Sequence, residues 1–157
     1  MEKELKLTLE KAQDTYKNGT PEHKKLLIDL YGKENFLLDI TERVFDYASA
    51  CEELGLTPLT INHFTFLPEE DQNRAFVRHQ LTIQTRALRG DWTPNFKDST
   101  YKYYNYFYWD TAKNGFSSYV YYYYLVSSVG SDLLFPNEKL ADYARNTFEK
   151  QYIAYHF

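Results

Sequence analysis

The stretch YKYYNYFYWDTAKNGFSSYVYYYYLV, residues 101–126, decides the fold class of this chain. It contains ten tyrosines, two phenylalanines and one tryptophan. Aromatic side chains favour pleated, half-buried strands, because flat rings pack well against their cross-strand neighbours. Asn114 and Gly115 interrupt the aromatic run with a pair that tolerates positive φ angles and is typical of tight hairpin turns. The stretch therefore predicts two antiparallel strands joined by a turn.

The length of the turn determines which residues face each other across the predicted hairpin. A two-residue turn at Asn114 and Gly115 places Trp109 opposite Val120. A longer loop between Asp110 and Gly115 changes the partners but leaves the two faces unchanged, because successive side chains of a strand point to opposite sides. The faces are therefore predicted with either loop.

The two predicted faces differ in chemical character. The first face consists of Tyr103, Asn105, Phe107, Trp109, Val120, Tyr122, Tyr124 and Val126. The second face consists of Lys102, Tyr104, Tyr106, Tyr108, Asp110, Tyr119, Tyr121, Tyr123 and Leu125. The first set includes Phe, Trp and two Val and is predicted to be the core side. On the second face every aromatic residue carries a hydroxyl, which is typical of a face that meets water, a partner or a ligand.

The composition of the whole chain limits the function classes. The 157 residues are predicted to form a single domain, with 43% hydrophobic and 25% charged residues. A net charge of −4 argues against broad, non-specific attraction to nucleic-acid backbones. The lone Cys51 fits a reducing compartment and a buried helical position. With no signal peptide or membrane span predicted, we expect a cytoplasmic protein or part of a particle assembled in the cytoplasm, such as a virion.

Capping signals predict helices along much of the chain. They begin after Thr8, Thr20, Asp46, Pro68 and Asn137, and the longest spans residues 69–89. Residues 36–44 are predicted to be a short strand or an irregular packed segment, and residues 59–67 to be extended. Residues 133–135 are predicted to add a short third strand to the hairpin. The fold class is thus α+β: a small antiparallel meander packed by helices, with a helical N-terminal part at 1–58 followed by the long helix, the hairpin and the C-terminal helix at 59–157.

The residue patterns of common catalytic and metal sites are missing from the sequence. The four histidines are His23, His63, His79 and His156, and none has a His or Cys at helical ligand spacing. No nucleophile elbow and no phosphate-binding glycine loop occurs. His79, beside the apolar stripe of residues 69–89, is typical of a half-buried, hydrogen-bonded histidine. We therefore predict no catalytic residues, no metal, no cofactor and a protein that is not an enzyme.

The hydroxyl-bearing face is the predicted binding site. Its members are Tyr104, Tyr106, Tyr108, Tyr121 and Tyr123, with Trp92 from the preceding loop. Tyrosine gives large contact area at low entropy cost, which favours a protein partner or self-association. The same rings could instead stack on the bases of single-stranded nucleic acid, on another ligand or on sugars. Only Lys97, Lys102 and Lys113 adjoin the hairpin, so nucleic acid is not favoured. The alternative is that these tyrosines have only a structural role and pack under helices on both sides of the sheet.

Four short motifs carry a resemblance to a known family. They are Gly90, Trp92 and Pro94 in GDWTPNF; Lys102, Tyr103 and Tyr104 in YKYYNYF; Gly130, Ser131, Leu133 and Phe135; and Leu140, Ala141, Tyr143 and Ala144. Together with TLEKAQDTYKNGTPEHKKLLIDLYG near the N-terminus, they resemble a family of uncharacterised proteins encoded by bacteriophages and by prophages of gut bacteria. The resemblance implies a phage setting, as a virion component or as an accessory factor directed at the host. It implies no catalytic residues.

Overall fold

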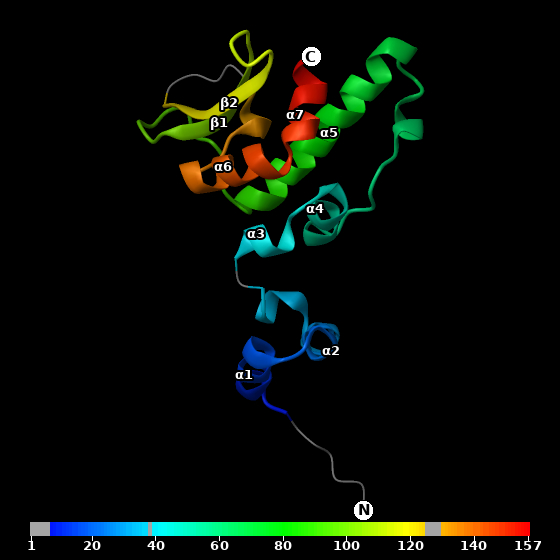
Figure 1. Cartoon of the computed structure of the whole chain (residues 1–157), viewed down its shortest axis with the longest axis vertical. Coiled ribbons are helices and arrows are strands. Elements are labelled where there is room, and N and C mark those ends of the chain that lie inside the picture. Colours follow the sequence, from blue (N-terminus) through cyan, green and yellow to red (C-terminus); the bar gives the residue numbers. More distant parts are fainter. Residues whose placement is uncertain (1–6, 38, 125–129) are drawn as a thin grey trace, which may run out of the picture. The chain divides into compact units, whose positions relative to one another are not determined.

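The computed structural model describes residues 7–37, 39–124 and 130–157, which form seven α-helices and one two-stranded antiparallel sheet (Figure 1). The α+β prediction is therefore confirmed. The chain divides into two compact units, Met1–Arg43 and Val44–Phe157. Among the described residues, no helix combines the length and the apolar character needed to cross a membrane.

The N-terminal unit is helical. Its elements are α1 (Leu9–Asn18), α2 (Pro21–Tyr31), the short 3-10 turn η1 (Lys33–Asn35) and α3 (Ile40–Arg43). The side chains of Thr8 and Thr20 cap α1 and α2, as predicted. The strand or irregular segment predicted at 36–44 is wrong over α3, because Asp39 accepts a hydrogen bond from the N–H of Thr41 and starts a helical turn there.

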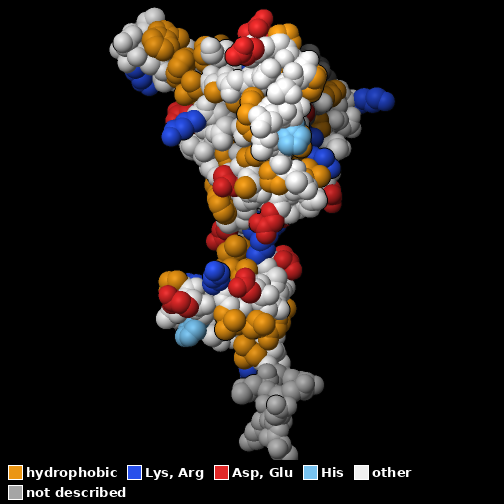
Figure 2. Space-filling model, turned by 90° about the vertical axis from the view of Figure 1, so that its right-hand side faces the viewer, with side chains coloured by type: hydrophobic (Ala, Val, Ile, Leu, Met, Phe, Trp, Pro, Cys, Tyr) orange, Lys and Arg blue, Asp and Glu red, His pale blue; other side chains and the backbone are white. Residues whose placement is uncertain are grey.

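The apolar stripe of α2 is only partly buried. Leu27 lies inside the unit, whereas Leu26 and Leu30 are exposed. Tyr16 and Phe36 stack with ring centroids 4.8 Å apart and tie α1 to the residues after η1. Figure 2 shows hydrophobic side chains gathered on part of the surface of this unit.

Helix α5 (Glu69–Arg89) is the long central helix of the second unit and has the predicted bounds. Gly90 ends it with a φ of 56°, a conformation that side chains other than glycine rarely adopt. The buried positions recur at helical spacing and are Val77, Leu81, Ile83, Gln84, Thr85, Ala87 and Leu88. This stripe supports most of the remaining elements of the unit.

Helix α4 (Tyr47–Glu53) packs on α5. Asp46 caps it by accepting a 2.7 Å hydrogen bond from the N–H of Ser49, and Cys51 is buried, both as predicted. The hydroxyl of Tyr47 lies 3.1 Å from Nε2 of His79. Burial lowers the pKa of His79, so the prediction of a half-buried, partnered histidine is confirmed.

The segment predicted to be extended at residues 59–67 contains a 3-10 helix, η2 (Ile61–Phe64). Nδ1 of His63 accepts a 3.1 Å hydrogen bond from the N–H of Thr60 and closes this turn. The prediction was wrong because an imperfect alternation of apolar residues does not distinguish a strand from a short turn of helix.

The hairpin consists of β1 (Lys102–Asp110) and β2 (Gly115–Tyr123). Trp109 pairs with Phe116, so the predicted two-residue turn and the pairing of Trp109 with Val120 are wrong. The loop holds four residues, 111–114, and Asn114 has a φ of 48°. Oδ1 of Asp110 accepts hydrogen bonds from the N–H groups of Ala112 and Lys113, which stabilises the longer loop. The predicted faces are confirmed, apart from Leu125 and Val126, which lie outside the described residues.

The predicted third strand is reduced to one pair of backbone hydrogen bonds. The N–H of Tyr103 donates to the carbonyl of Phe135 at 3.0 Å, and the N–H of Phe135 donates to the carbonyl of Tyr103 at 2.8 Å. The residues before this bridge form a 3-10 turn, η3 (Ser131–Leu133). Leu133, Leu134 and Phe135 are buried, so their apolar run reflects core packing and not a regular strand.

The C-terminal helix is two helices, α6 (Glu138–Thr147) and α7 (Glu149–His156). They contact the hairpin on one side and α5 on the other, so the second unit has a layered arrangement (Figure 1). Ala141, Ala144, Phe148 and Tyr152 are buried as predicted, whereas Leu140 is half-buried. The first face of the hairpin rests on this helical layer.

A polar cluster lies in the core between α5, β1 and α7. The ring of Tyr152 stacks on Phe107 with centroids 5.0 Å apart. Asn105 and Thr85 approach the Tyr152 hydroxyl, but neither that hydroxyl nor the Asn105 amide makes a hydrogen bond with the described residues. Burial raises the pKa of Tyr152 to about 12.

Replacing Tyr152 with phenylalanine is expected to raise stability at neutral pH by about 1 kcal/mol, because it removes a buried hydroxyl that forms no hydrogen bond with the described residues. The raised pKa of Tyr152 contributes stability below pH 10 that is lost as pH rises toward 12, and the full loss amounts to about 3 kcal/mol. Unfolding free energies of both proteins at about pH 9 and pH 11 test this. The Tyr152→Phe protein should lose less stability over that interval, whereas Tyr108→Phe, an exposed control, should behave as wild type. Equal losses in all three proteins would contradict the expectation.

Candidate tyrosine interface

Four tyrosines stand exposed on the second face of the hairpin and form what we term the tyrosine face. They are Tyr106 and Tyr108 on β1 and Tyr119 and Tyr121 on β2, each between 38% and 45% exposed. Tyr106 and Tyr119 are directly opposite in the register, with ring centroids 5.1 Å apart. Tyr119 also lies 6.1 Å from Tyr108 and 6.0 Å from Tyr121. The four rings thus form one continuous cluster.

The rings of the tyrosine face stand at varied angles to one another. The interplanar angle is 35° between Tyr106 and Tyr119, 60° between Tyr108 and Tyr119, and 73° between Tyr119 and Tyr121. The pKa of Tyr119 is raised above its ordinary value. The main cause is partial removal from water, and the smaller cause is electrostatic interaction with the neighbouring tyrosines. The hydroxyl of Tyr119 is therefore neutral near pH 7 and can donate or accept a hydrogen bond.

Tyr104 lies on the same side of the sheet but is buried. It is 3% exposed and stacks on Tyr123 with centroids 4.9 Å apart. The loop before β1 covers this end, since the ammonium of Lys102 lies 5.8 Å from the ring of Phe96 and 2.6 Å from Oδ1 of Asp98. Helices therefore cover the middle of the first face of the sheet, and the loop before β1 covers one end of its second face.

The structure groups the sequence-predicted site residues only in part. Tyr106, Tyr108 and Tyr121 lie together at the surface, Tyr104 is buried and Tyr123 is half-buried beside it. Trp92 is half-buried in the loop after α5, and no ring contact among the described residues joins it to the tyrosine face.

Sequence reasoning left Tyr119 out of the predicted site, although it is the centre of the cluster. The alternation of side chains already placed it on the correct face. The predicted two-residue turn set it opposite Asp110, whereas the true register sets it opposite Tyr106. The signal that could have found it is the loop length.

Charges at the loop end of the tyrosine face are paired. Nζ of Lys113 lies 3.8 Å from Oδ2 of Asp110, and both side chains contact the hydroxyl of Ser117. Lys102, on the same face by alternation, is buried. The exposed centre of the face is therefore polar through its hydroxyls but carries no net charge of its own.

The first face of the hairpin is a core face only in its middle. Asn105 and Phe107 are buried as predicted, whereas Trp109 and Tyr122 are exposed. Helices α6 and α7 do not cover the ends of the strands. A second exposed group, Tyr101, Tyr122 and Tyr124, results at one end, with the rings of Tyr101 and Tyr122 4.5 Å apart.

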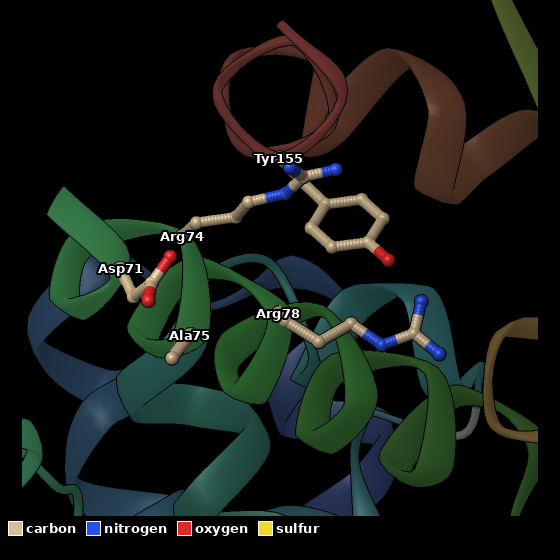
Figure 3. A pocket seen from close by; sticks show the side chains of 5 residues that line it. All are labelled: Asp71, Arg74, Ala75, Arg78 and Tyr155. Carbon is tan, nitrogen blue, oxygen red and sulfur yellow. The ribbon is translucent and has the colours of Figure 1, made fainter. Parts of the chain in front are cut away.

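A cavity of about 260 Å³ lies between α5 and α7 (Figure 3). The guanidinium carbons of Arg74 and Arg78 lie 5.6 and 5.0 Å from the ring centre of Tyr155. Nη2 of Arg78 donates to both carboxylate oxygens of Asp132, at 2.7 and 2.8 Å. These contacts hold α7 and η3 on α5.

The residues around that cavity do not form an arrangement suited to catalysis. Asp71 also lines it, so its charge is mixed. The pKa of the neighbouring His156 is lowered, mainly by burial and to a smaller extent by the positive charges of Arg74 and Arg78. Within the described ranges, no three His, Cys, Asp or Glu side chains are grouped as metal ligands. The tyrosine face is the better candidate, because its four rings are exposed and, among the described residues, make ring contacts only with other tyrosines of the hairpin.

Comparison with known proteins adds no relative: no family model, no curated protein and no solved structure matches this chain.

Proposed function

We propose that this protein is a non-enzymatic interaction protein that binds a protein partner through the tyrosine face. The observation that carries the proposal is the exposure of four mutually contacting tyrosines on a supported sheet. Four rings at about two-fifths exposure present roughly 350 Å² of aromatic surface, within the range of functional patches on soluble proteins. Such a patch has the size of the energetic centre of a protein interface.

The chemistry of the tyrosine face favours a protein partner over a charged polymer. Tyrosine loses little conformational entropy when bound, and its hydroxyl satisfies polar groups at an interface. Lys113, the lysine beside the exposed rings, contacts Asp110 and Ser117. Binding of a phosphate backbone needs several lysines or arginines. Single-stranded nucleic acid remains the second candidate, because exposed rings on a sheet also stack on bases.

A phage setting completes the proposal. The protein would act as a component of a virion or as an accessory factor that binds a host protein in the cytoplasm. The motifs around Trp92, Tyr103, Phe135 and Tyr143 support this setting by their resemblance to phage and prophage proteins.

The test compares two triple variants of the immobilised full chain. Tyr106→Ser, Tyr119→Ser and Tyr121→Ser remove the tyrosine face, and Tyr101→Ser, Tyr122→Ser and Tyr124→Ser remove three tyrosines of similar exposure elsewhere. Both are exposed to extract of the host cells and to phage particles, and bound proteins are quantified by mass spectrometry. A partner captured by wild type should fall at least about tenfold with the first variant and stay unchanged with the second.

Two results would contradict the proposed function. One is equal capture by wild type and by the tyrosine-face variant. The other is binding of a labelled thymidine oligonucleotide that weakens steeply with salt and depends on the same three tyrosines, which would favour the nucleic-acid function.

A further inference from the structure

Strand β2 is an edge strand of the sheet in the part of the chain that the structure describes. The sheet has two strands, and among the described residues no further strand pairs with β2 on its outer side. The bridge to Phe135 lies on the opposite side, at Tyr103 of β1. Open edges expose backbone N–H and C=O groups that can pair with another extended chain.

The register identifies the backbone groups that point outward. Tyr103 directs both its N–H and its C=O to Phe135, so its pairing with Tyr122 contains no hydrogen bond between β1 and β2. Bonded and non-bonded pairs alternate along antiparallel strands. The backbone groups of Phe116, Ser118, Val120 and Tyr122 therefore point away from β1.

One side chain reaches this edge from the helical layer. Nη1 of Arg145 donates to the carbonyl of Ser118 at 3.3 Å and to its hydroxyl at 3.1 Å, which agrees with an outward direction for that carbonyl. A carbonyl oxygen has two lone pairs and can accept a second hydrogen bond. The outward groups of Val120 and Tyr122 have no hydrogen bond to the described residues.

The sequence of strand β2 itself contains none of the residues that usually protect an edge. Its sequence, GFSSYVYYY, contains no charged residue and no proline over nine positions. Charged residues and proline are the common protection against pairing between edges. A strand that pairs with its own copy must avoid like charges opposite each other, and an uncharged strand meets that condition.

We infer that two copies of this chain pair along β2, antiparallel and about a two-fold axis, and form a four-stranded sheet. With Val120 at the axis, the N–H of each Val120 donates to the C=O of the other, and Ser118 of each copy lies opposite Tyr122 of the other. The two Arg145 contacts then lie about 13 Å apart along the strand, and each guanidinium also binds its own Asp142.

The paired sheet has a consequence for the tyrosine face. A two-fold axis perpendicular to the sheet keeps corresponding side chains on the same side. The tyrosine faces of both copies therefore join into one surface twice as large. The inference goes beyond the proposed function, because it uses the backbone edge of β2 and leaves the exposed rings free for a partner.

The test is the oligomeric state of the full chain, measured by sedimentation velocity from about 1 to 100 µM, together with Val120→Pro. Proline removes the outward N–H of Val120 without removing a hydrogen bond to β1. Wild type and the matched control Val120→Thr should shift from the 18.7 kDa monomer to twice that mass as the concentration rises to about 100 µM. Val120→Pro should sediment as a monomer with an unchanged circular dichroism spectrum.

A second measurement does not depend on how Val120→Pro folds. Amide hydrogen exchange of Val120 in wild type should slow at least about tenfold between the lowest and highest concentration, while that of Ala112 in the loop stays constant. A wild type that remains monomeric, or a dimer in which exchange of Val120 does not slow, would overturn the inference. A monomer that still binds a partner through the tyrosine face would contradict the dimer but not the proposed function. A dimer that binds no partner would support the dimer and contradict the proposed function.

Discussion

Replacing Lys102 with methionine is expected to lower the free energy of unfolding by about 3 kcal/mol, because a buried charge network loses its cation. Lys102 is 1% exposed although it carries an ammonium group. Its Nζ donates to Oδ1 of Asp98 at 2.6 Å, to the carbonyl of Thr100 at 2.7 Å and to that of Tyr124 at 3.2 Å. Methionine fills a similar volume but leaves these acceptors without their donor.

The same network predicts a dependence on pH. The pKa of Asp98 is lowered below its ordinary value of 3.8. The largest cause is the hydrogen bond from Lys102, and the next is the hydrogen bond from the N–H of Thr100. A lowered pKa in the folded state gives stability that is present above pH 3.8 and is lost as pH falls below it. Wild type should therefore lose more stability than Lys102→Met between about pH 5 and pH 3.

Denaturant unfolding monitored by circular dichroism measures both effects. The control is Lys97→Met, since Lys97 is an exposed lysine in the same loop and its replacement should change stability by less than about 0.5 kcal/mol. Equal stability of the Lys102→Met and Lys97→Met proteins would show that the ammonium of Lys102 does not hold the loop on the sheet. The covered end of the sheet would then need another explanation.

Local signals in the sequence predicted the elements whose ends are set by neighbouring residues. The prediction of helix α5 is correct at both ends. Proline disfavours a helical conformation of the residue before it, so the helix begins after Pro68, and the positive φ of Gly90 ends it. The division of the hairpin into two faces is correct, because alternation does not depend on the register. The register itself was wrong, because hydrogen bonds from the backbone to the side chain of Asp110 stabilise a four-residue loop in place of a two-residue turn.

Contacts between distant parts of the chain explain the remaining differences. Alternation places Tyr104 with the exposed tyrosines, but the loop that holds Asp98 covers that end of the sheet. The third strand was predicted from an apolar run at Leu133, Leu134 and Phe135, which is equally compatible with irregular core packing. Exposure at the ends of the hairpin depends on how far α6 and α7 reach, and periodicity carries no information about that distance.

Replacing Phe148 with alanine is expected to lower the free energy of unfolding by about 4 kcal/mol, because it empties a large buried site at the junction of two helices. Phe148 is 1% exposed and joins α6 to α7. Its N–H donates to the carbonyl of Ala144 at 2.9 Å, and its carbonyl accepts from the N–H of Tyr152 at 3.1 Å. The ring meets Tyr143 edge to face, with centroids 6.4 Å apart.

The loss should reach the hairpin, because α6 and α7 form the layer on which its first face rests. Phe148→Leu, which keeps most of the volume, should cost less than about 1.5 kcal/mol. Phe66→Ala is the control, since Phe66 is 79% exposed and should change stability by less than about 0.5 kcal/mol. Denaturant unfolding is followed by the fluorescence of Trp109 in a Trp92→Phe background, which reports on the hairpin, and by far-ultraviolet circular dichroism, which reports mainly on the helices. Coincident shifts of both signals in Phe148→Ala are expected, whereas a shift in the helical signal alone would mean that the hairpin is stable without this layer.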